Sequence, residues 1–226
     1  MTNNVKNIIV GAAALYISAK NSQDDSADFY DATTGQTKVA LPTLSASTAA
    51  KAAFDASTEW RGVGYTEGGV NVSYEPTYGE VPVDQLLDAA VLFKSAMKVV
   101  VKTGLAEATL TNLIVAWGQK GTSLDSTLTG DPDASLAEEL GIAGGQLYDQ
   151  PVERGVAFIG PAPRSTGGLK RERVYHLRRA LNVTTTAFDL KKDAATNIPV
   201  ELRLLQDPYY SGKEYGIIRD RNVVAA

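Results

Sequence analysis

Residues 70–88 read VNVSYEPTYGEVPVDQLLD, a stretch in which apolar and polar side chains alternate along the chain. A period of two predicts β-strands with one buried face and one face in water. Because Pro76–Gly79 carries turn-forming residues, we expect a hairpin with strands at 70–75 and 80–88. Its polar face carries mainly carboxylates, those of Glu75, Glu80, Asp84 and Asp88.

Residues 91–102 predict a further strand, which would span about 40 Å if fully extended. One face is apolar, and the other face carries Lys94, Lys98 and Lys102 between smaller apolar side chains. Since neither face is fully polar, we expect both faces to be partly covered.

A helix is predicted at about residues 105–117, directly after Gly104. A second, shorter helix is expected from Asp131–Pro132, an N-cap followed by proline, to Gly141. Helical spacing in the first helix places four apolar side chains on one stripe, which should pack on the core: Leu110, Leu113, Ile114 and Trp117.

The last third of the chain again favours strands, at 155–159, 171–181, 184–190 and 198–205. Long strands with one good helix predict a mainly β fold, an antiparallel sandwich or barrel with the helix packed on it. The β–α–β alternation of a nucleotide-binding sheet is absent. We expect one domain over residues 1–226.

Residues 21–57 differ in composition, because they are rich in Ser, Thr, Ala and Asp and contain few large apolar side chains. Such a segment buries little, so a long, flexible and exposed loop is expected, with a short helix at 49–56.

Composition excludes several classes of site. The chain has no cysteine and one histidine, His176, so disulfides, thiolate metal sites and histidine-rich metal sites are excluded. The net charge of −4 gives no bulk attraction to nucleic acid or to an anionic membrane. The apolar run 8–17 imitates a secretory signal, but it alternates like a strand and is shorter than the ~20 residues that span a bilayer. No membrane association is expected.

Motifs for catalysis or cofactor binding fail at required positions. Gly62–Val63–Gly64 resembles a dinucleotide loop, but Glu67 stands where the third glycine belongs. Asp131 and Asp133 imitate a calcium loop that lacks its glycine. His176 lies in the middle of the predicted strand 171–181, with no second histidine in the chain, so a hydrogen-bonded structural role is expected. We therefore expect no enzyme, no cofactor and no metal site.

A basic cluster is the best candidate for contact with nucleic acid: Lys170, Arg171, Arg173, Arg178 and Arg179. Strand alternation divides these side chains between two faces, and only Tyr175 supplies an aromatic ring for base stacking. Ion pairing between subunits accounts for the cluster at least as well.

Two blocks of sequence form one ordered pattern of motifs. The first contains Trp60–Thr66 (WRGVGYT), the hairpin ending in Val83–Gln85, the long strand, and Leu105–Leu110 (LAEATL). The second contains Phe158–Pro161, Ile198–Val200, Leu205–Pro208 and Tyr215–Gly216. Each motif alone has low specificity, but together the blocks cover roughly residues 5 to 220, and their order and spacing resemble the major tail tube protein of long-tailed bacteriophages.

This resemblance implies a β-sandwich or barrel-like core with a packed helix, in subunits that form hexameric rings. The rings stack into a tube, strands of all subunits join around a lumen, and DNA passes through it without specific binding during genome ejection. The implied partners are other copies of the chain, the tape measure protein, the tail terminator and distal tail proteins. The implied location is the virion tail, after assembly in the host cytoplasm.

Residue roles follow as hypotheses from this resemblance and from the strand pattern. Carboxylates in the lumen would repel the DNA phosphates, so Glu75, Glu80, Asp84 and Asp88 are expected to face the lumen. Subunit-interface roles are expected for six basic residues: Lys94, Lys98, Lys102, Arg173, Arg178 and Arg179.

Three other functions remain open at this stage. The inner tube protein of a contractile injection system would share the ring architecture. A monomeric β-barrel that binds a small ligand would stay monomeric and contain an apolar cavity. A hydrolase acting through dispersed carboxylates would lose activity on one or two substitutions.

Overall fold

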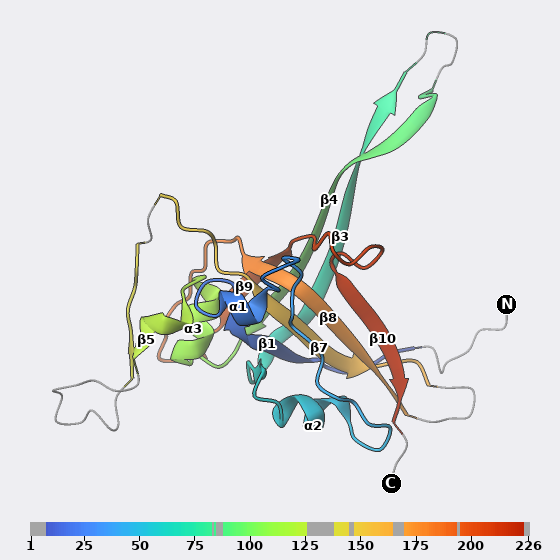
Figure 1. Cartoon of the computed structure of the whole chain (residues 1–226). Coiled ribbons are helices and arrows are strands. Elements are labelled where there is room, and N and C mark those ends of the chain that lie inside the picture. Colours follow the sequence, from blue (N-terminus) through green and yellow to red (C-terminus); the bar gives the residue numbers. More distant parts are fainter. Residues whose placement is uncertain are drawn as a thin grey trace.

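The computed structural model describes residues 8–82, 84, 88–125, 138–144, 147–164, 170–193 and 195–223. The chain is mainly β and antiparallel, as the sequence predicts (Figure 1). Eight strands form one sheet: β1 (Ala14–Asn21), β2 (Trp60–Gly62), β3 (Thr66–Val81), β4 (Val91–Leu105), β7 (Arg154–Pro161), β8 (Arg171–Asn182), β9 (Ile198–Leu204) and β10 (Gly216–Asn222). The remaining elements are short: α1 (Ser26–Phe29), α2 (Ala50–Asp55), α3 (Leu110–Ala116), the 3₁₀ helix η2 (Gly121–Ser123), β5 (Leu124–Asp125) and β6 (Glu139–Leu140).

The strand order of the sheet brings its two ends close together. The order is β2-β1-β7-β8-β9-β4-β3, and β10 pairs with the first part of β8. Residues 63–65 alone join β2 to β3, which lie at opposite ends of this order. The sheet must therefore curl, and its inner face encloses the main core.

The main core lies inside this curl and is covered by α3. Alternate residues of β9 point inward, and Val99 and Val101 of β4 join them. Val100 is also fully buried, so both faces of β4 are covered at this level, as expected from the sequence. Further core residues come from four elements, β1, β7, β8 and α3: Leu15, Ile17, Val156, Phe158, Leu177, Ala180, Val115 and Ala116.

The predicted helix is present but begins later than expected. β4 continues through Gly104 to Leu105, because these residues pair with Pro199 and Ile198 of β9. Thr109 then caps α3 by accepting a hydrogen bond from the Asn112 backbone N–H.

The apolar stripe predicted for this helix is only partly buried. Ile114 is buried, whereas Leu110, Leu113 and Trp117 are half-buried, and Trp117 stacks on Phe188 at 6.3 Å between ring centroids. The helix also buries Asn112, Val115 and Ala116. The stripe therefore identified the helix but only part of its buried face.

The turn predicted at Pro76–Gly79 is wrong, because β3 runs through these residues without interruption. Tyr78 pairs with Lys94 and Gly79 with Phe93, so the chain reverses only after Val81. A Cβ atom built on Gly79 would lie 2.5 Å from Phe93 Cζ, so this glycine makes room for an aromatic ring. Proline is tolerated because β3 is an edge strand.

The segment 21–57 is mostly irregular, as expected, but it is not simply an exposed loop. Phe29, Ala50 and Phe54 are fully buried, and Ala50 and Phe54 lie in the predicted short helix. Ala50 and Phe54 form a second core on the outer face of the sheet with Tyr16 and Trp60. The expectation that this segment buries little is therefore wrong at its aromatic residues.

Two further strand predictions differ from the structure. Residues 184–190 form no strand, and β10 was not predicted. The helix predicted from Asp131 lies mostly outside the described residues, as does the calcium-like pattern.

His176 lies in β8 and is buried, with 4% of its surface exposed. It faces the segment 21–57, which contains Val39. The ring contacts Trp60 edge-on and hydrogen-bonds the backbone of Val39, while Nε2 has no hydrogen-bond partner in the described part of the chain. Burial, followed by the charge of Arg178, lowers the pKa of His176 to about 4. The imidazole is therefore neutral in the folded protein at neutral pH, which fits a structural role.

The pKa of His176 predicts a loss of stability in mild acid. A histidine in an unfolded chain has a pKa of about 6.5. Between pH 6.5 and 4, His176 is therefore protonated in the unfolded chain but neutral in the folded chain. The contribution of neutral His176 to the free energy of unfolding is complete above pH 6.5, and it is lost as the pH falls from 6.5 to 4. When the pH is lowered from 7.5 to 4.5, the free energy of unfolding should fall by about 2 kcal/mol more in the wild-type protein than in the variant His176→Gln. Urea titrations at both pH values measure the difference, and equal losses in the two proteins would contradict the prediction.

Candidate assembly surface

A long arm, formed by Asn71–Val81 of β3 and Val91–Lys98 of β4, projects from the body of the protein (Figure 1). None of these residues is buried. Several large apolar side chains on the arm are 43% to 63% exposed: Val72, Tyr74, Tyr78, Val81, Val91, Leu92 and Phe93. Such a concentration of exposed apolar side chains typically marks an interaction surface.

A β-bulge in the arm decides which side chains share a face. Thr77 pairs with Ala96, but the next residue, Tyr78, pairs with Lys94, so Ser95 is an extra residue in β4. The bulge shifts the alternation of β4 by one residue relative to β3. Lys94 consequently lies on the opposite face from Lys98 and Lys102, which corrects the prediction that all three share one face.

The first face, the tyrosine face, continues the inner surface of the sheet. It carries the pairs Val72–Val101 and Tyr74–Val99 near the body, and Tyr78–Lys94 and Glu80–Leu92 farther out. Lys94 Nζ donates a hydrogen bond to the Tyr74 hydroxyl at 3.1 Å and lies 5.6 Å from the centre of its ring. The hydrogen bond to Tyr74 raises the pKa of Lys94.

The second face carries a ladder of opposite charges near the body. Lys98 lies 3.7 Å from both Glu75 and Glu201, and Lys102 lies 2.9 Å from Glu201. The Ser73 hydroxyl, followed by Lys98, lowers the pKa of Glu75. Hydrogen bonding to Glu201 raises the pKa of Lys102. The two acids and two lysines therefore balance one another within the chain.

The four predicted lumen residues do not share one face. Glu75 lies in the charge ladder, whereas Glu80 lies on the tyrosine face, because no turn separates them and their spacing is odd. Asp84 and Asp88 are exposed beyond the strand ends. The one-face pattern that motivated the lumen hypothesis is therefore wrong, and a lumen position for any of these residues stays a prediction.

The three predicted interface arginines have partners within the chain. Arg173 binds Asp220 through two hydrogen bonds of 2.6 and 2.8 Å. Arg178 is buried, lies 3.7 Å from the centre of the Tyr210 ring and donates to the Lys213 carbonyl.

Arg179 binds Glu153 through two hydrogen bonds of 2.7 and 2.9 Å, and Tyr30 donates to the same carboxylate at 2.6 Å. Fold stabilisation thus accounts for the charges of all three arginines, and their interface role stays a prediction.

The outer edge of β3 is open. β3 pairs with β4 on one side, and no strand in the described part of the chain pairs with its other side. An open strand edge can pair with a strand of another chain. The arm therefore offers a second chain both apolar side chains and backbone hydrogen-bonding groups.

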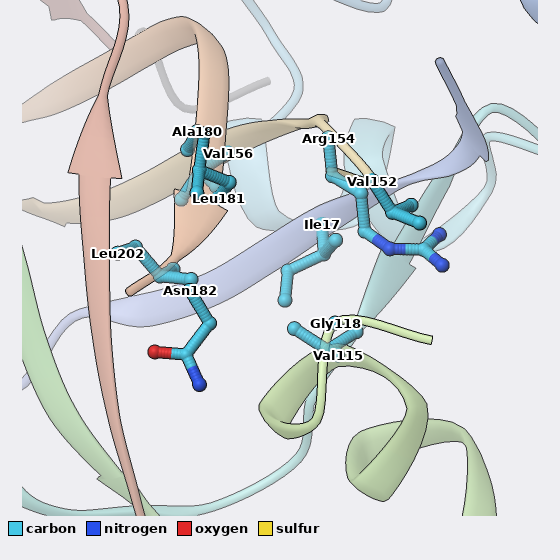
Figure 2. A pocket seen from close by; sticks show the side chains of 10 residues that line it. All are labelled: Ile17, Val115, Gly118, Val152, Arg154, Val156, Ala180, Leu181, Asn182 and Leu202. Atoms are coloured by element: carbon cyan, nitrogen blue, oxygen red, sulfur yellow. The ribbon is translucent and has the colours of Figure 1, made fainter. Parts of the chain in front are cut away.

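The interior offers little space for a ligand at the cavity under α3. This cavity has a volume of about 10 Å³, which is room for about one water molecule. Figure 2 shows its lining, in which Ile17, Val115, Val156 and Leu202 surround the space and Arg154 and Asn182 supply the polar groups. Arg154 donates to the Gln119 carbonyl at 3.0 Å, which satisfies part of its charged end.

The described residues contain no cluster of three or more His, Asp or Glu side chains that could hold a metal ion. Within the same residues, no helix is long and apolar enough to cross a membrane.

The exposed apolar residues of the arm were not identified from sequence as a site. The sequence signal for this surface is the apolar run Ala89–Phe93, which follows the acidic residues Glu80, Asp84 and Asp88. Such a run resembles the start of a buried strand. Only the projection of the hairpin beyond the body leaves this run exposed.

No protein-family model and no curated protein matches the chain.

Proposed function

We propose that the chain is a structural subunit that assembles into stacked hexameric rings and forms the tail tube of a long-tailed bacteriophage, the conduit for DNA ejection. The observation that carries the self-assembly is the arm, whose large apolar side chains are exposed and whose outer strand edge pairs with no strand in the described part of the chain. The resemblance of the sequence to tail tube proteins supplies the ring and the tube.

Burial of the arm by a second copy has a clear physical benefit. Each fully buried Val, Leu or Phe side chain contributes about 1.5–3 kcal/mol relative to its exposed state. A closed ring also pairs every strand edge, which removes the risk of uncontrolled aggregation. The same physics applies to the inner tube of a contractile injection system, the close alternative.

Purified protein should form rings or tubes as its concentration rises. Sedimentation velocity over a concentration series, followed by negative-stain microscopy, measures the assembly state. Stacked rings with six subunits are the expected result. A monomer at every concentration would contradict the proposal and favour a monomeric ligand-binding module.

A further inference from the structure

A groove of about 1000 Å³ lies on the body at the end where β7 stops and β8 starts. The segment before β1 forms one wall with Ile8, Ile9 and Val10, which are 68%, 41% and 86% exposed. Gly11 allows this segment to approach the sheet, since a Cβ atom there would lie 2.9 Å from Pro161 Cγ. This wall of the groove therefore packs against Pro161, and its apolar side chains are exposed.

The rim of the groove is basic. Arg164 and Lys170 are exposed and Arg171 is half-buried, and no carboxylate in the described part of the chain forms an ion pair with any of them. The Nε atom of Arg171 is buried and has no hydrogen-bond partner among the described residues. By contrast, Glu172 accepts from the Ala50 N–H and from Arg221. The rim thus presents three basic side chains that form no ion pair among the described residues, beside an apolar wall.

The tip of the arm has the complementary chemistry. Glu80, Asp84 and Asp88 are exposed and form no ion pair among the described residues. Exposed apolar side chains of Val81 and Val91 lie at the ends of the two strands, next to these acids. Three unpaired carboxylates with apolar neighbours therefore match three unpaired bases with an apolar wall.

The tip and the groove of one chain are far apart. Figure 1 shows the arm projecting away from the body, while the groove lies at the ends of β7 and β10. A contact between unlike surfaces of two copies is heterologous, so it generates closed rings or open helical stacks.

Other segments of this chain match the groove less well. Residues 1–7 carry a lysine and no carboxylate, and residues 165–169 carry no charged side chain. Neither segment would neutralise the rim.

We propose that the acidic arm tip of one copy docks in the basic groove of the next copy. This inference rests on the proposed self-assembly and names the two surfaces that meet.

Charge reversal on each surface tests the contact. The groove variant is Arg164→Glu, Lys170→Glu, Arg171→Glu, and the tip variant is Glu80→Lys, Asp84→Lys, Asp88→Lys. Each variant alone should need a concentration about 100-fold higher to assemble, because like charges then meet. An equimolar mixture should assemble again, since acidic tips meet basic grooves and basic tips meet acidic grooves in alternation. Raising the salt concentration should weaken this contact in the wild-type protein.

The control variant reverses three exposed lysines outside the groove, Lys191→Glu, Lys192→Glu and Lys213→Glu. It should assemble like the wild-type protein, and circular dichroism checks that all variants fold. If either charge-reversed variant assembled at the same concentration as the wild-type protein, the docking inference would be overturned and the proposed function would still stand. Loss of assembly in both variants without recovery in the mixture would also overturn it. A wild-type protein that never assembles would overturn both proposals.

Discussion

Replacement of Phe54 with alanine should lower the free energy of unfolding by about 3–5 kcal/mol. The Phe54 side chain is fully buried between Tyr16 and Trp60, with ring centroids at 4.9 and 5.2 Å. Its removal leaves a cavity that the surrounding rings cannot fill, and it takes away aromatic contacts as well as buried area. Urea denaturation followed by tryptophan fluorescence measures the change.

The same substitution should loosen the docking of residues 38–57 on the sheet. Phe54 anchors α2, and the Trp60 indole N–H donates to the Ala40 carbonyl at 2.8 Å, so the two contacts hold one segment. Limited proteolysis should therefore cleave this segment faster in Phe54→Ala than in the wild-type protein.

Phe93→Ala is the matched control for this prediction. Phe93 is 50% exposed on the arm, so its truncation should change stability by less than about 1 kcal/mol. A similar loss of stability in both variants would contradict the assignment of Phe54 to a second core.

Strands that cross the body could be predicted from sequence. β7, β8 and β9 lie within one or two residues of their predicted bounds, because their apolar periodicity comes directly from burial in the sheet. The buried parts of the segment 21–57 could not be predicted in the same way. Phe29 and Phe54 are isolated apolar residues in a polar stretch, and only tertiary contacts make them core residues.

The hairpin shows how local signals can mislead. Pro76 and Gly79 are turn-forming residues, yet Gly79 serves to accommodate the Phe93 ring and Pro76 occupies an edge strand. The misplaced turn reset the alternation, so Glu75 and Glu80 were predicted on one face although they lie on opposite faces. The bulge at Ser95 had no sequence signal, and it moved Lys94 away from Lys98.

β10 was missed for a different reason. Its pairing with β8 is supported by the Arg173–Asp220 ion pair, and its sequence GIIRDRN has only two large apolar residues. A half-exposed strand with so little apolar periodicity resembles a loop.

The tyrosine face of the arm should be required for assembly and dispensable for folding. Tyr74, Tyr78 and Leu92 are 63%, 57% and 63% exposed, so a triple substitution by serine removes little that the monomer buries. The free energy of unfolding of the monomer should stay within about 1 kcal/mol of the wild-type value. Tyrosines at the centre of an interface often contribute about 2 kcal/mol or more each, so assembly should be lost over at least a 100-fold range of concentration.

A matched control keeps the chemistry and changes the location. Tyr148, Tyr209 and Leu190 are 91%, 56% and 82% exposed and lie outside the arm, so their triple substitution by serine should leave assembly intact. Equal loss of assembly in both triple variants would mean that general surface hydrophobicity, and not the arm, drives association. Retained assembly in the arm variant would contradict a role for the tyrosine face. Because these substitutions leave the acidic tip unchanged, they test the apolar contribution of the arm independently of its charge.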